Sequence, residues 1–353
     1  INTLREIASD VFHLETRGAE ALQYGPPMGL RDLREIIVSD LLAPKGVKTT
    51  ADNVLITSGG LESMNLVCQL FIDPGDVILV ERPTFVHCVE IFDMFEAKCI
   101  SCEMDEHGLI MEDVEEKIKK YNPKIVYTIP TFQNPTGITL SEERRKKLAE
   151  LGSQYDVIIL EDDPYRDIRY SGVDLPMIKA FDQTGHTILA NSFSKIFSPG
   201  SRLGYVVASD AIIKKIFDAK TATNSHTGMI SQVLCAEFFK RGYFPAHHKM
   251  ICDLYRERRD IMLACLDEQF PKGTKHTYPD GGLFTWVELP GINTTDLLKE
   301  AVSHKVAYMA GAGFFTDGGG LGSNCMRISF SAVTPDRIRE GMRRLSNLVN
   351  EKV

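Results

Sequence analysis

The chain lacks the features that mark a membrane protein or a nucleic-acid-binding protein. No apolar run in its 353 residues approaches the roughly 20 residues needed to span a bilayer. Lys and Arg number 40 against 48 Asp and Glu, and they are scattered rather than clustered. No basic surface for nucleic acid or an anionic membrane is therefore indicated. These absences favour a cytoplasmic protein that acts on small molecules.

The eight cysteines and nine histidines show no spacing typical of a disulfide framework or a metal site. Cys99 and Cys102 form the one close pair, and they lie in AKCISCEM, whose alternating pattern predicts a strand. Residues three apart in a strand point to opposite faces of the sheet, so we expect the two thiols to share no ligand. Reduced, mostly buried thiols and no metal are the prediction.

Short apolar runs rich in Val and Ile alternate with amphipathic segments between about residues 50 and 210. Nearly continuous apolar runs are typical of strands that are buried on both faces. Their alternation with helical segments predicts an α/β domain with a mainly parallel sheet. The predicted strands are VLIT (54–57), VILVE (77–81), KIVYTI (124–129), VIILE (157–161), TILAN (187–191) and GYVVAS (204–209).

Beyond this region the pattern changes to charged helical segments, GGLFTWVELP, a glycine-rich loop at 311–322 and MRISFS. The change indicates a second, smaller α+β domain. The glycine-rich loop lacks the Lys and Ser/Thr of a P-loop, so we expect a mobile loop beside the last strand. Residues 1–23 are expected to form one helical stretch. The predicted divisions are an N-terminal helix and linker at 1–26, a large domain at 27–250 and a small domain at 251–353.

Ligands of parallel sheets bind beyond the carboxyl ends of the strands, so the residues after each predicted strand are the candidates for a site. Thr57-Ser58-Gly59-Gly60 leads into a helix and could expose N–H groups to a phosphate. Phe85 could lie on a heteroaromatic ring, and Asn134 presents an amide in a turn made rigid by prolines. Taken singly, an ordinary glycine turn, a core Phe or an Asn-Pro turn explains each feature as well.

The later strand ends carry more specific chemistry. The acids at 161–163 would repel one another unless a cation lies nearby, and a protonated ring nitrogen would supply it. Ser192, Ser194 and Lys195 follow the fifth strand, and Arg202 precedes the sixth. One sheet edge would then hold an amine, an anion-binding guanidinium, hydroxyls, an acid, an amide and an aromatic ring. This combination predicts a functional site.

In their order and spacing these motifs resemble the class I/II aminotransferases, which are fold-type I enzymes dependent on pyridoxal phosphate (PLP). The pattern is most similar to the kynurenine/2-aminoadipate aminotransferase branch. The resemblance runs from about Tyr24 to the C-terminus and rests on QNPTG, DDPY, SFSK followed by PGSRLG, and MRISFS. It implies a large domain with a seven-stranded, mainly parallel sheet, a smaller α+β domain and a homodimer. The implied reaction moves an amino group from an amino acid to a 2-oxo acid.

The resemblance also implies a role for each residue at the strand ends. Lys195 forms the Schiff base with PLP and moves the proton, and Asp162 pairs with the pyridine nitrogen. Asn134 and Tyr165 hydrogen-bond the 3′-oxygen of the ring, and Arg327, together with Asn134, binds the substrate carboxylate. Phe85 stacks on the ring. The phosphate is held by Gly59, Gly60, Leu61, Ser192, Ser194 and Arg202, and by Tyr24 of the partner subunit.

Two alternatives stay open. The fold also supports C–S lyases and other eliminating enzymes, because the outcome depends on which Cα bond is held perpendicular to the ring. An aminotransferase-like domain also serves as the PLP-sensing effector domain of GntR/MocR-type transcriptional regulators. The chain begins at Ile1, where family members have already passed an N-terminal arm, so we expect an arm or an upstream domain to be missing. The substrate stays open among 2-aminoadipate and aromatic, branched or glutamate-like amino acids.

Overall fold

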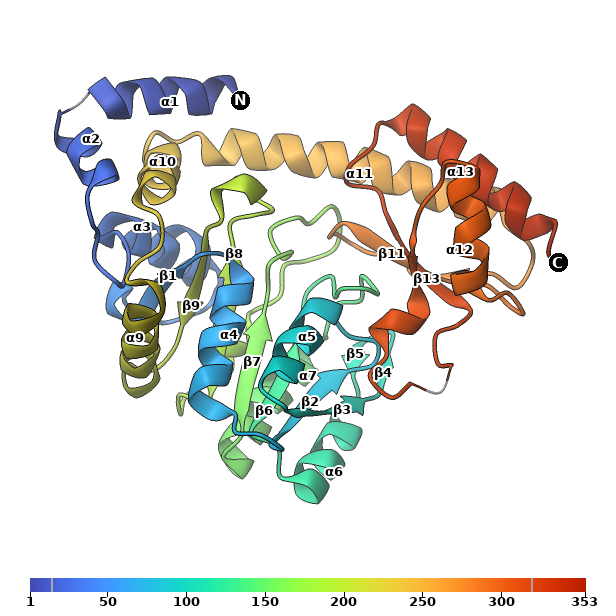
Figure 1. Cartoon of the computed structure of the whole chain (residues 1–353), viewed down its shortest axis with the longest axis horizontal. Coiled ribbons are helices and arrows are strands. Elements are labelled where there is room, and N and C mark those ends of the chain that lie inside the picture. Colours follow the sequence, from blue (N-terminus) through green and yellow to red (C-terminus); the bar gives the residue numbers. More distant parts are fainter. Residues whose placement is uncertain (14, 319) are drawn as a thin grey trace.

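A computed structural model of the chain describes residues 1–353 except residues 14 and 319. Two predicted segments include these residues: the N-terminal helical stretch includes residue 14, and the glycine-rich loop includes residue 319. At these two positions the predictions lie outside the described residues. On either side of residue 14 the structure has two helices, α1 (Asn2–His13) and α2 (Glu15–Leu22), where the sequence predicts one stretch. In Figure 1 the two helices run in different directions, and the division at residues 1–26 stays a prediction.

A seven-stranded sheet with the order β1-β9-β8-β7-β6-β2-β3 forms the centre of the larger part of the molecule. All pairs within it are parallel except those of β9, which runs antiparallel to β1 and β8. The predicted mainly parallel sheet of an α/β fold is thereby confirmed, with strand bounds close to those expected. The strands are β1 (Val54–Thr57), β2 (Val77–Glu81), β3 (Lys98–Cys102), β6 (Ile125–Thr128), β7 (Ile158–Asp162), β8 (Thr187–Ser192) and β9 (Gly204–Val207).

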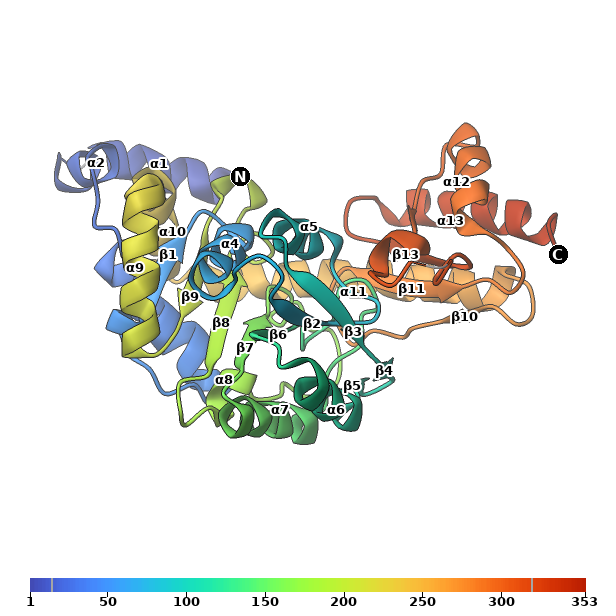
Figure 2. The same cartoon turned by 60° about the horizontal axis from the view of Figure 1, so that its bottom comes forward.

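Helices cover both faces of this sheet, which explains why its strands are apolar throughout (Figure 2). On one face lie α6 (Met111–Tyr121), α7 (Glu142–Tyr155) and α8 (Ile178–Phe181), and on the other lie α4 (Gly60–Phe71) and α5 (Val86–Met94). Cys102 belongs to the core beneath α6 and α7, whereas Cys99 packs against the core of the other face. The prediction that these two thiols point to opposite faces is confirmed.

None of the described helices is long and apolar enough to cross a membrane.

Further helices and two short strands complete the larger part of the molecule. The additional helices are α3 (Arg31–Ile36), η1 (Ile37–Leu42), η2 (Ala43–Lys45), η3 (Ala51–Asn53), η4 (Pro199–Ser201), α9 (Asp210–Asn224) and α10 (Met229–Lys240). The additional strands are β4 (Met104–Asp105) and β5 (Gly108–Leu109), which pair with each other.

A four-stranded antiparallel sheet with the order β10-β11-β13-β12 forms the centre of the C-terminal part. The long helix α11 extends from the larger part of the molecule to the C-terminal part (Figure 1). The predicted boundary between residues 250 and 251 falls within this helix. The division into domains stays a prediction. The elements here are α11 (Phe244–Gln269), β10 (Lys275–His276), β11 (Phe284–Glu288), α12 (Thr294–Ser303), β12 (Met309–Ala310), η5 (Gly311–Phe314), β13 (Cys325–Ser329) and α13 (Pro335–Asn350).

Candidate functional site

The turn between β1 and α4 contains two consecutive glycines, Gly59 and Gly60. We call this turn the phosphate cradle. Gly59 has a φ of +94°, and a Cβ added there would lie 2.5 Å from Nη2 of Arg202, so the position requires glycine. Helix α4 begins at Gly60 with no side chain capping its N-terminus, which leaves backbone N–H groups available. Arg202 forms no ion pair with any described residue. A guanidinium facing a free helix N-terminus suits a phosphate.

Two serines at the end of β8 lie beside this cradle. Ser192 ends the strand, and its Cβ lies 3.9 Å from the Cβ position of Gly60. The Ser192 hydroxyl donates to Oγ of Ser194 over 2.9 Å and accepts the backbone N–H of Ser194 over 3.1 Å. Leu61 lies in the first turn of α4, where it is exposed. The hydroxyls and the helix N-terminus therefore belong to one region.

The three consecutive acids do not share one compensating cation, which corrects the expectation from the sequence. Asp163 pairs with Arg166 over 2.8 Å, and both side chains are fully buried. Glu161 accepts the N–H groups of Ile178 and Lys179 at the start of α8, over 2.8 Å each. Consecutive residues of an extended chain point to opposite sides. The partners of Glu161 and Asp163 therefore do not pair with Asp162, which lies between these two acids.

Asp162, the middle acid, has no cation within ion-pair distance among the residues that the structure describes. It is 6% exposed, and its Oδ2 accepts a hydrogen bond from the Tyr127 hydroxyl over 2.9 Å. Burial raises the pKa of Asp162 to about 7, although the bond from Tyr127 lowers it. A cation placed beside this carboxylate would favour its ionised form.

Tyr127 is a site residue that sequence reasoning missed. It stands inside KIVYTI and therefore looks like a core aromatic residue of β6. The one signal in the sequence was its phenolic hydroxyl, which needs a partner when it is buried in a strand. The partner, Asp162, belongs to the neighbouring strand β7.

Asn134, Tyr165 and Arg327 form a chain of hydrogen bonds between the two sheets. The Asn134 amide donates to the Tyr165 hydroxyl over 3.4 Å, and Nη1 of Arg327 donates to the Asn134 oxygen over 2.7 Å. Burial raises the pKa of the Tyr165 hydroxyl well above its ordinary value. Arg327 lies on β13 of the small sheet and is more than 190 positions from Asn134 in the sequence. Its contact with Asn134 completes a group of three predicted site residues.

Lys195 lies beside the same group, with its Nζ 5.8 Å from the centre of the Tyr165 ring. Burial lowers the pKa of this amine, and the positive charges of Arg327 and Arg202 lower it further. A lowered pKa increases the fraction of neutral amine, which is the form that acts as a nucleophile and base.

The Arg327 guanidinium lies in an aromatic environment without a carboxylate. Its Cζ is 4.0 Å from the centre of the Phe284 ring and 5.3 Å from that of Phe314, and Nη2 contacts the sulfur of Met309. No described Asp or Glu pairs with it. Burial lowers the pKa of Arg327, because the charge is partly removed from water. A bound carboxylate would match this guanidinium in charge and geometry.

The two remaining predicted residues lie at the margin of this group. Phe85 immediately precedes α5 and is half-buried, with its ring edge-on to His87 at 5.3 Å. Tyr24 is 85% exposed, and its ring lies edge-on to His226 at 5.8 Å. Among the described side-chain contacts, neither ring reaches another predicted site residue of this chain.

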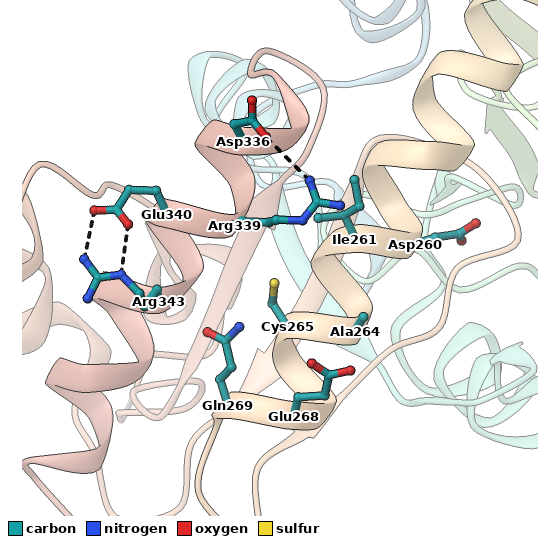
Figure 3. Close-up of a pocket in the computed structure, with 10 residues that line it drawn as sticks. All are labelled: Asp260, Ile261, Ala264, Cys265, Glu268, Gln269, Asp336, Arg339, Glu340 and Arg343. Atoms are coloured by element: carbon teal, nitrogen blue, oxygen red, sulfur yellow. Dashed lines mark hydrogen bonds and ion pairs between the residues drawn. The ribbon is translucent and has the colours of Figure 1, made fainter.

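A second concavity lies far from the strand ends, between α11 and α13 (Figure 3). Its volume is about 730 Å³. Arg339 lies 3.7 Å from Asp336, and Arg343 lies 2.9 Å from Glu340. The two arginines of this groove are thus matched within α13 itself, and the groove contains none of the residues that the sequence predicts.

Comparisons with known proteins agree with the geometry. A family model described as aminotransferase class I and II matches residues 4–345. The aromatic-amino-acid aminotransferase 1 of Thermococcus litoralis is 39% identical, over 100% of this chain and 85% of its own length. A kynurenine aminotransferase of Pyrococcus horikoshii, solved in complex with PMP, superposes with a TM-score of 0.94. It is 39% identical, and the match covers 100% of this chain and 87% of that one.

A third relative carries an amino acid joined to the cofactor. The α-aminoadipate aminotransferase of Thermus thermophilus, solved with N-(5′-phosphopyridoxyl)-L-leucine, superposes with a TM-score of 0.92 at 31% identity. The match covers 99% of this chain and 88% of that one. The sequence resemblance, the fold and the cofactor are thereby confirmed. The chain belongs to the class I and II aminotransferases, with the fold of the fold-type I PLP enzymes and pyridoxal phosphate as its cofactor.

Proposed function

We propose that this aminotransferase uses Lys195 to move the amino group of a 2-aminoadipate-like, aromatic, branched or glutamate-like amino acid to a 2-oxo acid. The observation that carries the proposal is a set of charged groups at one sheet edge without partners among the described residues. Asp162 lacks a cation, and Arg327 and Arg202 lack carboxylates. PLP and an amino acid offer the three matching charges, which are the ring nitrogen, the α-carboxylate and the phosphate.

The residues of the strand ends fit PLP. When bound, PLP supplies an electron sink for the bonding electrons of the substrate Cα. Asp162 holds the proton at the pyridine nitrogen, because a buried carboxylate favours a charged neighbour. Asn134 and Tyr165 hydrogen-bond the 3′-oxygen, and Phe85 lies against the ring. The phosphate is bound by Gly59, Gly60, Leu61, Ser192, Ser194 and Arg202.

Lys195 has two tasks in this proposal. Its amine would hold PLP at the edge of the large sheet until an amino acid binds. The free amine would then accept the proton from the substrate Cα, because its lowered pKa increases the fraction of neutral amine. Arg327 holds the substrate carboxylate with help from Asn134, to which it is already hydrogen-bonded. The active unit is a homodimer, in which the exposed Tyr24 of the partner subunit reaches the phosphate.

The substrate class rests on two observations. The relatives named above are called aromatic-amino-acid, kynurenine and α-aminoadipate aminotransferases. The rings of Phe284 and Phe314 flank Arg327, so the wall beside the bound carboxylate is apolar. An apolar wall suits aromatic and medium-sized aliphatic side chains.

A half-reaction assay tests the proposal. The PLP-loaded protein is mixed with single amino acids in the absence of any 2-oxo acid. We expect 2-aminoadipate or an aromatic amino acid to bleach the visible band, with one equivalent of keto acid released per site. Continuous release of pyruvate and ammonia from cystathionine without an acceptor would support the C–S lyase instead. A band that no amino acid changes would support the PLP-sensing domain of a regulator.

A further inference from the structure

A buried lysine that the proposed chemistry does not use lies behind the phosphate cradle. Lys220, on α9, has no exposed surface. Its Nζ donates to Oε2 of Glu62 over 2.6 Å and to Oγ1 of Thr227 over 2.9 Å. Burial lowers the pKa of Lys220, whereas its bond to Glu62 opposes this change. A charged lysine is seldom fully buried unless a carboxylate pairs with it.

Glu62 is bound to the cradle itself. It lies in the first turn of α4, and its Oε2 also accepts the backbone N–H of Ser58 over 2.6 Å. Its carboxylate therefore folds back toward the residue that precedes Gly59 and Gly60. Asn224, at the end of α9, donates to its other oxygen over 2.5 Å.

This position creates an electrostatic conflict with a phosphate. A carboxylate at a helix N-terminus interacts favourably with the helix dipole, as a bound anion does. Two anions at one helix end repel each other, and the repulsion is strong where water is partly excluded. Glu62 alone would therefore oppose the phosphate that the cradle is proposed to bind. A cation beside Glu62 removes the conflict.

Lys220 is that cation, and it is also joined to the strand that leads into the cradle. Thr227, which accepts a bond from Lys220, donates to the carbonyl oxygen of Ile56 in β1 over 3.2 Å. Its hydroxyl also lies 3.3 Å from Oγ of Ser58. The amine is thus connected to both sides of the turn, through Glu62 and through Thr227.

We propose that Lys220 neutralises the charge of Glu62 beside the β1–α4 turn, and that this neutralisation allows the turn to bind the 5′-phosphate of PLP. The two are positioning residues, because they act through Ser58 and the helix N-terminus. The proposal rests on the proposed function in one respect, since it takes Gly59 and Gly60 as the phosphate site.

The test compares two ligands that differ by the phosphate alone. Dissociation constants for PLP and for pyridoxal are measured on the cofactor-depleted enzyme, by quenching of Trp286, the single tryptophan of the chain. We expect Lys220→Met to weaken PLP binding by roughly 10- to 100-fold and to change pyridoxal binding little. Glu62→Gln and the double variant Glu62→Gln/Lys220→Met should bind PLP at least as tightly as the wild type.

Three results would overturn the pair. Lys220→Met could weaken both ligands equally or neither, or the double variant could be as weak as Lys220→Met. Should Lys220→Met fail to fold, the near-isosteric Glu62→Gln still decides, because weaker PLP binding by that variant contradicts the proposal. Failure of the proposed function looks different: the wild type itself would then bind PLP no better than pyridoxal.

Discussion

The groove between α11 and α13 and the carboxyl edge of the large sheet both gather arginines and acids, but they differ in how the charges are matched. In the groove, Arg339 is paired with Asp336 and Arg343 with Glu340, all on one helix (Figure 3). Such exposed pairs contribute little to stability, and they leave neither arginine without a carboxylate partner.

At the edge of the large sheet and on the strand β13 that contacts it, the charges of Asp162 and Arg327 have no partners within the described part of the chain. Asp162 and Arg327 are largely removed from water, and each loses solvation without a compensating ion pair. Such an arrangement costs free energy in the folded state unless a ligand supplies the missing charge. Between these two regions, unmatched charge rather than cavity volume therefore distinguishes the candidate site.

The largest effect is expected when Asp162, which has no charge partner, and Asp163, which has one, are each changed to Asn. We expect Asp162→Asn to lower kcat/KM by on the order of 10³, because the ring nitrogen loses its charge partner. Asp163→Asn should instead cost about 1 to 3 kcal/mol of stability, because it removes one of the two carboxylates that pair with the buried Arg166 and leaves Asp174 as the other. Steady-state kinetics and denaturant unfolding separate the two. A folded Asp163→Asn enzyme as slow as Asp162→Asn would contradict the assignment.

A smaller effect is expected at the arginines of the two regions. Arg327→Lys should raise KM for the amino acid by roughly 10- to 100-fold, because an ammonium cannot bind a carboxylate bidentately. The matched control in the groove, Arg343→Lys, should leave KM within about twofold, because its pair with Glu340 is exposed. Initial-rate measurements check both variants. Similar KM values for the two would remove the distinction between the regions.

The smallest effect concerns pH and the cofactor-free protein. Burial raises the pKa of Asp162 to about 7, so ionising this residue opposes folding. Its cost is absent below the unfolded pKa of about 4 and grows as pH rises to about 7. Cofactor-free Asp162→Asn should therefore be more stable than the wild type at about pH 8, by roughly 2 kcal/mol or more. Urea unfolding should show that the difference in unfolding free energy between the two proteins falls toward zero at about pH 4. A difference that does not change with pH would contradict the claim that ionised Asp162 destabilises the cofactor-free protein.

The sequence predicts the large sheet well because its strands are buried on both faces, which makes them apolar throughout. It predicts the site because parallel strands place their following residues at one edge. The partners of Glu161 and Asp163 could not be predicted, because they depend on where α8 and Arg166 fold back. Lys220 and Glu62 are 158 positions apart, and no local pattern connects them.

The central claim is that Lys195 holds the cofactor at this edge of the sheet. The most direct test is the visible absorption spectrum of the protein with PLP, recorded for the wild type and for Lys195→Ala, before and after an amino acid is added. The account predicts a visible band in the wild type that the amino acid bleaches, and its loss in Lys195→Ala. The same spectrum in both proteins, or no band in either, would contradict it.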